Sequence, residues 1–221
     1  AVGRDERYLF FRELKKKHRA AAIVTAHHAD DQAETVLFNL VRGCGFDGLA
    51  GMQVFDGDLW RPLLHVPKIA LLRYCRQNKL LFLHDSSNDD LQLSRNVLRK
   101  KVLPQLKKLN PQFLKTMGKN IALWTKARDY LQQRSEHFLS GARLSPRRYA
   151  LKSFLALPEY EQQSTLRALF EQTHGHKKNL QQSHLEQLLK VLRSPVSGKK
   201  KEFGDGKVLV KQKTFFEIVH T

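Results

Sequence analysis

Two histidines and three acidic side chains lie within eight residues of one another near the start of the chain. They are His27, His28, Asp30, Asp31 and Glu34. Imidazole and carboxylate groups can transfer protons, and paired carboxylates can hold a cation. Acidic groups at a helix start can instead only complement the helix dipole, for roughly 0.3 to 1 kcal/mol each. The histidines favour a functional site, because neither imidazole is expected to help cap a helix.

The elements around this cluster predict a junction between a strand and a helix. Residues 21–26 are a short apolar run typical of a buried strand, and residues 30–42 repeat apolar side chains at helical spacing. Open α/β sheets bind ligands at the carboxyl ends of their strands. Either Asp30 or Asp31 is expected to cap the helix. Glu34 lies three residues after Asp31, so both carboxylates share one helix face and could hold a cation together.

A glycine-rich turn follows the predicted helix. Arg42, Gly43, Cys44 and Gly45 end it, and the two glycines would let the backbone approach an anion. Cys44 and Cys75 are too isolated for a disulfide framework or a metal quartet, which fits a reducing cytoplasm. No resident metal is expected, because adjacent histidines point their rings apart and no third soft ligand follows at suitable spacing.

The net charge of +18 is the strongest feature of the composition. Residues 1–110 contain 19 basic and 12 acidic side chains, whereas residues 111–221 contain 20 and 9. An excess of this size indicates a polyanionic partner, and nucleic acid fits better than a membrane surface because no long basic amphipathic stretch dominates. No apolar run approaches the length of a membrane span.

Periodicity and turn residues predict the remaining organisation. Helices are expected at 4–18, from Pro67, from Arg95 with a kink at Pro104, and over 111–138; strands are expected at Leu59–Leu64 and Leu80–His84. Residues 140–150 read as a polar break, two amphipathic helices follow, and Gly204-Asp205-Gly206 is a hairpin signal. The chain is therefore predicted to divide into a domain at 1–110, a helical linker at 111–150 and a small domain at 151–221.

Several linked motifs resemble the catalytic domain of bacterial tRNA(Ile)-lysidine synthetases, which are ATP pyrophosphatases of the PP-loop type. The motifs are HHADDQAETVLFNLVRGCG, GLAGM, RPLL, HDSSNDD and RNVLRKKVLPQL, and they span roughly residues 1 to 110. The resemblance implies an α/β fold with an incomplete doubly wound parallel sheet, like that of adenine nucleotide alpha hydrolases. Residues 1–110 would be the C-terminal part of the ATP-binding catalytic domain. A small, mostly helical C-terminal domain with a terminal β-hairpin would follow, and the resemblance implies that residues 151–221 bind tRNA.

The resemblance also implies a reaction. ATP adenylates the C2 carbonyl oxygen of one anticodon cytidine in tRNA(Ile), and the ε-amine of free lysine then displaces AMP to give lysidine. ATP and Mg²⁺ are the implied cofactors, tRNA(Ile) and free lysine the partners, and the cytoplasm the location; no membrane is expected, and a homodimer is left open. Motif matching implies catalytic roles for His27, Asp31, Glu34, Arg42, Arg95, Asn96 and Arg99, substrate binding by Asp31 and Glu34, and cofactor binding by Gly43 and Gly45.

Two departures from the family pattern affect these expectations. The chain contains no Ser-Gly-Gly-x-Asp-Ser loop for the ATP phosphates, so it is expected to be a fragment that cannot turn over ATP alone. His84 and Ser86 stand where the family usually has Glu and Pro. Two alternatives stay open: another PP-loop tRNA-modifying enzyme such as a 2-thiocytidine synthetase, whose cysteine pairs are not matched here, and a non-catalytic basic RNA-binding module.

Overall fold

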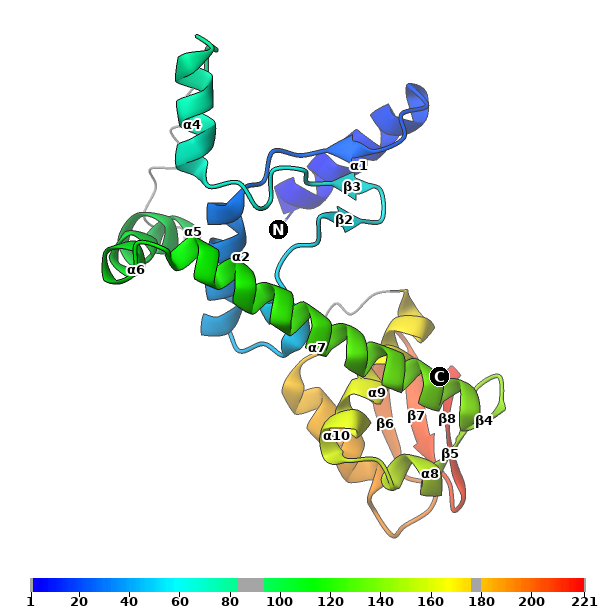
Figure 1. Ribbon diagram of the computed structural model, residues 1–221. Coiled ribbons are helices and arrows are strands. Elements are labelled where there is room, and N and C mark those ends of the chain that lie inside the picture. The colour runs from blue at the N-terminus through cyan, green and yellow to red at the C-terminus, as the bar shows by residue number, and fades with distance from the viewer. Residues whose placement is uncertain (1, 83–93, 176–179, 221) are drawn as a thin grey trace. The chain divides into compact units, whose positions relative to one another are not determined.

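The structure, a computed structural model, describes residues 2–82, 94–175 and 180–220 and contains two compact units (Figure 1). The units are Ala1–Arg128 and Asp129–Thr221, and their boundary falls within the long helix α7 (Phe113–Gly141). This boundary lies inside the segment at 111–150 that the sequence predicts as a helical linker. None of the described helices is long and apolar enough to cross a membrane.

Unit 1 contains a short mixed sheet whose strands are β1 (Ile23–Val24), β2 (Phe55–Asp56) and β3 (Leu59–Trp60). The strand order is β1-β3-β2: β1 is parallel to β3, and β2 is antiparallel to it. These strands are shorter than the predicted runs at 21–26 and Leu59–Leu64. Only Ile23 and Leu59 are buried, while Val24 and Trp60 are exposed, so few apolar contacts extend the pairing.

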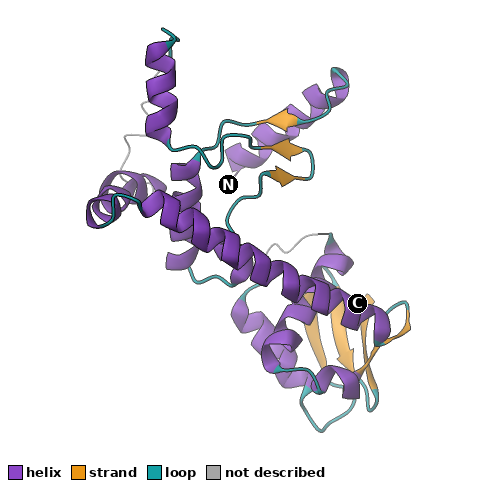
Figure 2. Cartoon of the chain, viewed as in Figure 1, coloured by secondary structure: helices purple, strands orange, loops and turns teal. Residues whose placement is uncertain are grey.

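Helices dominate the rest of unit 1, as Figure 2 shows. They are α1 (Val2–Lys17), α2 (Ala29–Val41), α3 (Phe46–Leu49), α4 (Lys68–Gln77), α5 (Ser94–Val97), a π-helical turn η2 (Leu98–Val102) and α6 (Leu103–Leu109). Ala33 and Val36 of α2 form a small core with Leu103 of α6 and with Met117 and Ile121 of α7. This core fixes α2, the helix that contains the predicted site carboxylates Asp31 and Glu34.

The predicted proline kink takes the form of a widened helical turn. Pro104 lacks an N–H, and in a regular α-helix its ring would collide with the carbonyl four residues earlier. The chain widens just before it: the Leu103 N–H donates to the Leu98 carbonyl, five residues back. The helix therefore continues past Pro104 instead of ending there.

Unit 2 is built on a five-stranded antiparallel sheet in the order β4-β5-β8-β7-β6. Its strands are β4 (Arg143–Ser145), β5 (Arg148–Ala150), β6 (Lys200–Gly204), β7 (Lys207–Lys211) and β8 (Phe215–His220). The predicted hairpin at Gly204–Gly206 is confirmed and joins β6 to β7. The polar break predicted at 140–150 is wrong, because it contains β4 and β5. Only Tyr149 of these two strands is buried, so the segment has no apolar alternation to reveal it.

The helices of unit 2 pack with this sheet around one apolar core. They are α8 (Leu151–Leu155), α9 (Glu159–His174) and α10 (Gln182–Leu192). Leu185, Leu188 and Leu192 repeat at helical spacing on α10 and are buried, while Phe216 and Ile218 alternate with less buried residues along β8. The chain thus has a mixed α/β fold with an antiparallel hairpin of β7 and β8 at its end, as the sequence predicts, although the C-terminal sheet has more strands than expected.

One predicted strand falls partly outside the described residues. Residues 80–82 have no regular structure. His84 and the polar loop Asp85-Ser86-Ser87-Asn88 lie outside the part of the chain that the structure describes.

Candidate active site

His28 begins α2 through a reciprocal pair of hydrogen bonds. The Asp31 N–H donates to His28 Nδ1 at 3.3 Å, and the His28 N–H donates to Asp31 Oδ2 at 3.0 Å. This is a capping box in which an imidazole replaces the usual hydroxyl. The expectation that Asp30 or Asp31 is the cap, and that neither imidazole helps, is therefore wrong. An imidazole Nδ1 that carries no proton has one acceptor lone pair, which is enough for this single hydrogen bond.

Asp30 links α2 to two other helices. Its Oδ2 accepts a hydrogen bond from the Lys68 N–H at 2.8 Å, and its Oδ1 pairs with the Lys107 ammonium. Asp30 thus caps α4 instead of its own helix. Burial raises the pKa of this carboxyl, but the Lys107 ammonium and the Lys68 N–H outweigh it and lower the pKa below its ordinary value.

Arg99 brings together two carboxylates of the predicted site. Arg99 Nε donates to Glu34 Oε1 at 2.7 Å and Arg99 Nη2 to Glu34 Oε2 at 2.9 Å, a bidentate pair. Nη2 also donates to Asp31 Oδ1 at 3.2 Å. Glu34 is only 3% exposed. Hydrogen bonding to Glu34 raises the pKa of Arg99, so its guanidinium stays charged.

Phe38 holds two more arginines of the predicted site. The Cζ atoms of Arg42 and Arg95 lie 5.2 Å and 5.3 Å from the centre of its ring, within the range of cation–π attraction. Both arginines are exposed. Among the described residues, neither forms an ion pair. Phe38 lies four residues after Glu34 on one helix face, and Arg95 lies four residues before Arg99. The contacts Glu34–Arg99 and Phe38–Arg95 therefore lie one after the other where the two helical segments meet.

His27 and Asn96 lie near the same junction. His27 Nδ1 is 2.8 Å from the Thr25 hydroxyl, whereas His28 Nδ1 faces Asp31, so the adjacent rings have different partners. Asn96, between Arg95 and the η2 turn, is buried. Within the described ranges, no three His, Cys, Asp or Glu side chains are grouped so that they could hold a metal ion.

The glycine turn after α2 is open to approach from outside. Gly43 has φ +77° and its N–H donates to the Leu40 carbonyl, the αL ending that favours glycine. A Cβ built on Gly43 or Gly45 would meet nothing within 4 Å. Burial raises the pKa of the Cys44 thiol, which opposes formation of a reactive thiolate.

Residues of the GLAGM and RPLL motifs form hydrogen bonds that fix the loop packed beside α2. Gln32 donates to the Met52 carbonyl at 2.9 Å and accepts from the Met52 N–H at 2.8 Å. Buried Arg61 donates to the Gln53 carbonyl at 2.8 Å. Sequence reasoning missed Gln32, and it missed Phe38 and Lys107 as well. Only the spacing of Phe38 from Glu34 on one helix face could have indicated any of the three.

Comparison with known proteins places these residues in a family. Residues 1–106 match the model of the PP-loop domain. The tRNA(Ile)-lysidine synthase of Enterococcus faecalis is 37% identical over 201 residues, 87% of this chain and 43% of the relative. The tRNA(Ile)-lysidine synthase of Bacillus subtilis is 41% identical over 136 residues, which are 60% of this chain and 29% of the relative. The tRNA(Ile)-lysidine synthase of Thermosipho africanus is 41% identical over 112 residues, which are 51% of this chain and 26% of the relative.

The match to the E. faecalis protein reaches well beyond the PP-loop domain, since it covers most of the chain. The chain spans at most half the length of these curated relatives. The motifs around α2 and Arg99 lie inside the matched domain. The chain therefore belongs to the tRNA(Ile)-lysidine synthase family of PP-loop proteins.

Proposed function

We propose that this chain is part of an enzyme that ligates lysine to C2 of an anticodon cytidine in tRNA(Ile), through an adenylated tRNA intermediate. Membership in a PP-loop family implies the use of ATP. The main support from the structure is the convergence of Asp31, Glu34 and Arg99, with Arg42 and Arg95 nearby over the ring of Phe38. A site of this kind offers carboxylate to an ammonium and guanidinium to a phosphate.

The contacts suggest different roles for the two carboxylates. Both oxygens of buried Glu34 are taken by Arg99, so Glu34 would act on lysine only through the position and charge of that arginine. The Asp31 side chain is 20% exposed. Its Oδ1 accepts one hydrogen bond from Arg99 Nη2, at 3.2 Å, which is longer than either bond from Arg99 to Glu34. Asp31 is therefore the carboxylate that we assign to the lysine ammonium, with Glu34 as the residue that positions Arg99.

The arginines would act on the phosphate side. Arg42 and Arg95 are exposed cations fixed over one ring, which suits the α-phosphate of ATP or the adenylated cytidine. Gly43 and Gly45 offer open backbone beside Arg42 for the same group. We assign His27 to proton transfer at the lysine amine, and Asn96 to the support of Arg95 and Arg99 from within the helix.

The described carboxylates do not suit Mg²⁺ in this arrangement. Those of Asp30 and Glu34 are already bound to Lys107 and Arg99, and Asp31 Oδ2 accepts from the His28 N–H. Mg²⁺ prefers oxygen ligands that are free to complete an octahedron. We therefore assign no step to Mg²⁺ at these residues.

We place the reaction in the cytoplasm.

Steady-state kinetics of three variants tests these assignments. The chain is extended at its N-terminus with a Ser-Gly-Gly-x-Asp-Ser segment and assayed for AMP release with tRNA(Ile), lysine and ATP. Asp31→Asn should raise the KM for lysine by roughly tenfold or more and leave the KM for ATP unchanged, because a charged contact contributes about 1.5 to 3 kcal/mol. An unchanged KM for lysine contradicts the assignment of Asp31.

Glu34 and Arg99 should behave as one unit. Glu34→Gln and Arg99→Lys should each lower kcat, because each breaks the bidentate pair. The double variant should then cost little more than either single variant, since both remove the same interaction. Additive losses would show that Glu34 acts on substrate independently of Arg99.

A further inference from the structure

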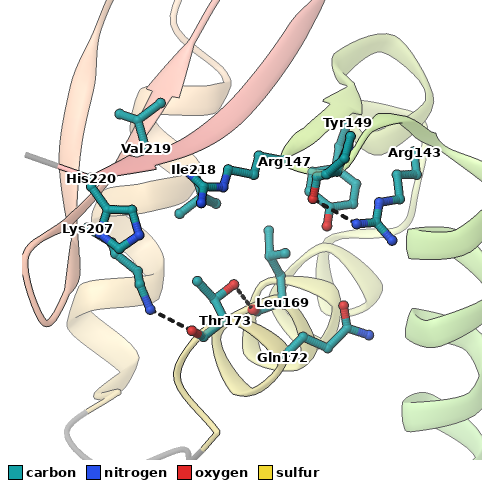
Figure 3. A pocket seen from close by; sticks show the side chains of 11 residues that line it. Arg143, Arg147, Tyr149, Leu169, Gln172, Thr173, Lys207, Ile218, Val219 and His220 are labelled. Atoms are coloured by element: carbon teal, nitrogen blue, oxygen red, sulfur yellow. Dashed lines mark hydrogen bonds between the residues drawn. The ribbon is translucent and has the colours of Figure 1, made fainter.

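Unit 2 contains a cavity of about 330 Å³ lined by cationic side chains and by none of the acidic residues in the described chain. Figure 3 shows that its lining comes from the β4–β5 hairpin, from α9 and from the ends of β7 and β8. Its cationic residues are Arg143, Arg147 and Lys207, with His220 beside them. Two other cavities in the same unit contain carboxylates as well as cations: Glu159 and Glu186 in one, Glu202 and Asp205 in the other.

The fold holds two of these cations in place. Lys207 donates from Nζ to the Thr173 carbonyl at 2.5 Å, which places its ammonium at the C-terminal end of α9. Arg143 donates to the Pro146 carbonyl at 2.9 Å and to the Ser145 carbonyl at 3.3 Å. These acceptors carry no formal charge, so each contact orients the side chain without supplying a carboxylate partner from the described residues.

Arg147 is the cation best placed to bind a ligand. Its backbone carbonyl accepts from the Ile218 N–H at 3.1 Å, which anchors the turn between β4 and β5 to β8. Its exposed guanidinium forms no ion pair or hydrogen bond within the described ranges. Figure 3 shows the side chain extending between Ile218 and Tyr149. Burial raises the pKa of Tyr149 and nearby Arg143 opposes this shift, so a neutral hydroxyl adjoins the cations.

We propose that this cavity binds a phosphate group of a nucleic-acid backbone. Uncompensated cations around one hollow repel one another, and a phosphate oxyanion relieves that repulsion while accepting several hydrogen bonds. The backbone of RNA is the source of phosphate that we favour, because the whole chain has a net charge of +18. The inference rests on the proposed function for the identity of the RNA, and it adds a defined contact site within unit 2.

Two adjacent arginines provide a matched test. Arg148 follows Arg147 directly, but its Nε donates to Glu217 at 2.8 Å and its Cζ lies 4.8 Å over the Phe215 ring. Arg148 does not line the cavity. Arg147→Gln and Arg148→Gln each remove one positive charge from neighbouring positions, so general electrostatics affects both variants alike.

The first measurement is the binding of a tRNA(Ile) transcript to the full chain over a range of salt concentrations, without ATP or lysine. Arg147→Gln should weaken binding about tenfold at low salt and reduce the slope of log K against log salt by roughly one. Arg148→Gln should change the slope much less. Equal slopes for the two variants would overturn the proposal.

The second measurement separates backbone phosphate from free phosphate. Inorganic phosphate, compared with chloride at equal ionic strength, should raise the unfolding temperature of the unsubstituted chain and of Arg148→Gln more than that of Arg147→Gln. If this difference appears while both variants bind tRNA equally, the cavity takes free phosphate and the nucleic-acid assignment is wrong. A clear difference in tRNA binding without any lysidine formation would count against the proposed function and not against this site.

Discussion

Phe38 contacts both of the arginines that we assign to phosphate in the proposed function. It lies under two guanidinium groups that have no carboxylate partner among the described residues. Two like charges held together are useful where an anionic phosphate must be bound, and they repel each other where it is absent. The aromatic ring offsets part of that repulsion, since each cation–π contact contributes roughly 0.5 to 1 kcal/mol at an exposed site.

Replacing Phe38 should separate ring electronics from ring volume. Phe38→Leu should lower the free energy of unfolding by about 1 to 2 kcal/mol and weaken ATP-dependent AMP release, because Arg42 and Arg95 lose their support. Phe38→Tyr should keep both properties near those of the unsubstituted protein. Urea unfolding and AMP release measured on both variants check this expectation. Equal behaviour of the leucine and tyrosine variants would contradict it.

Asp30 should make the stability of unit 1 depend on acid. Its folded-state pKa is lowered, so its stabilising contribution is present above the ordinary pKa of an Asp carboxyl, near 3.9. That contribution is lost as the pH falls through the lower, folded-state value. Asp30→Asn should cost about 1 to 3 kcal/mol at pH 7.

The difference between Asp30→Asn and the unsubstituted protein should shrink below about pH 4, which urea unfolding at several pH values would measure. Glu13→Gln, at an exposed carboxylate of the same unit, is the control and should show little loss at either pH. A difference that stays constant down to pH 2 would mean that Asp30 acts by shape and not by charge.

The sequence indicated which of the candidate residues lie close together, but it did not indicate most of the contacts that they make. The spacing of Asp31 and Glu34 indicated a shared helix face, and both contact Arg99. Nothing in the sequence revealed that the partner is an arginine 65 residues away, because such pairing depends on how α2 meets η2. The cap at His28 was missed for a different reason, since imidazole is an unusual capping acceptor.

At the scale of elements, α2 is placed by a polar clamp as well as by its apolar core. Gln32 binds both backbone groups of Met52, and Gly51 approaches it with φ +62°. A Cβ on Gly51 would lie 2.8 Å from Gln32 Oε1. Position 51 therefore requires glycine for two reasons: its backbone conformation and the lack of space for a Cβ.

Gly57 provides a control for that requirement, because it has the same φ of +62° and a Cβ there would meet nothing within 4 Å. Gly57→Ala should cost roughly 1 to 2 kcal/mol from the left-handed conformation alone. Gly51→Ala should cost at least about 1 kcal/mol more, since Gln32 must move and loses hydrogen bonds. Equal costs in urea unfolding would show that the clamp is not needed.

Elements with clear periodicity were predictable, and those fixed by tertiary contacts were not. The amphipathic helix α10 and the hairpin at Gly204–Gly206 follow directly from apolar spacing and turn residues. The β4–β5 hairpin does not, because β8 supplies its pairing from 65 or more residues later in the chain. The π-helical turn before Pro104 also had no sequence signal beyond the proline itself.

At the scale of the whole molecule, charge is the dominant property. A chain of net charge +18 should bind tRNA mainly through backbone phosphates, whatever the chemistry at α2. If about six phosphates are contacted, affinity should fall by roughly three orders of magnitude between 50 and 200 mM salt. Filter binding measures this directly, and an affinity independent of salt would exclude the backbone mode.

The product left on the tRNA tests the proposed function most directly. The chain extended with a Ser-Gly-Gly-x-Asp-Ser segment is incubated with tRNA(Ile), ATP and isotopically labelled lysine, and the tRNA is digested to nucleosides for mass spectrometry. We expect label on one anticodon cytidine, with AMP and pyrophosphate released, and much less label with Asp31→Asn at the same lysine concentration. In a parallel reaction supplied with a sulfur donor, sulfur on that cytidine would indicate a thiolating enzyme. Unmodified tRNA that is still bound tightly would indicate an RNA-binding module, and either result would contradict lysidine formation.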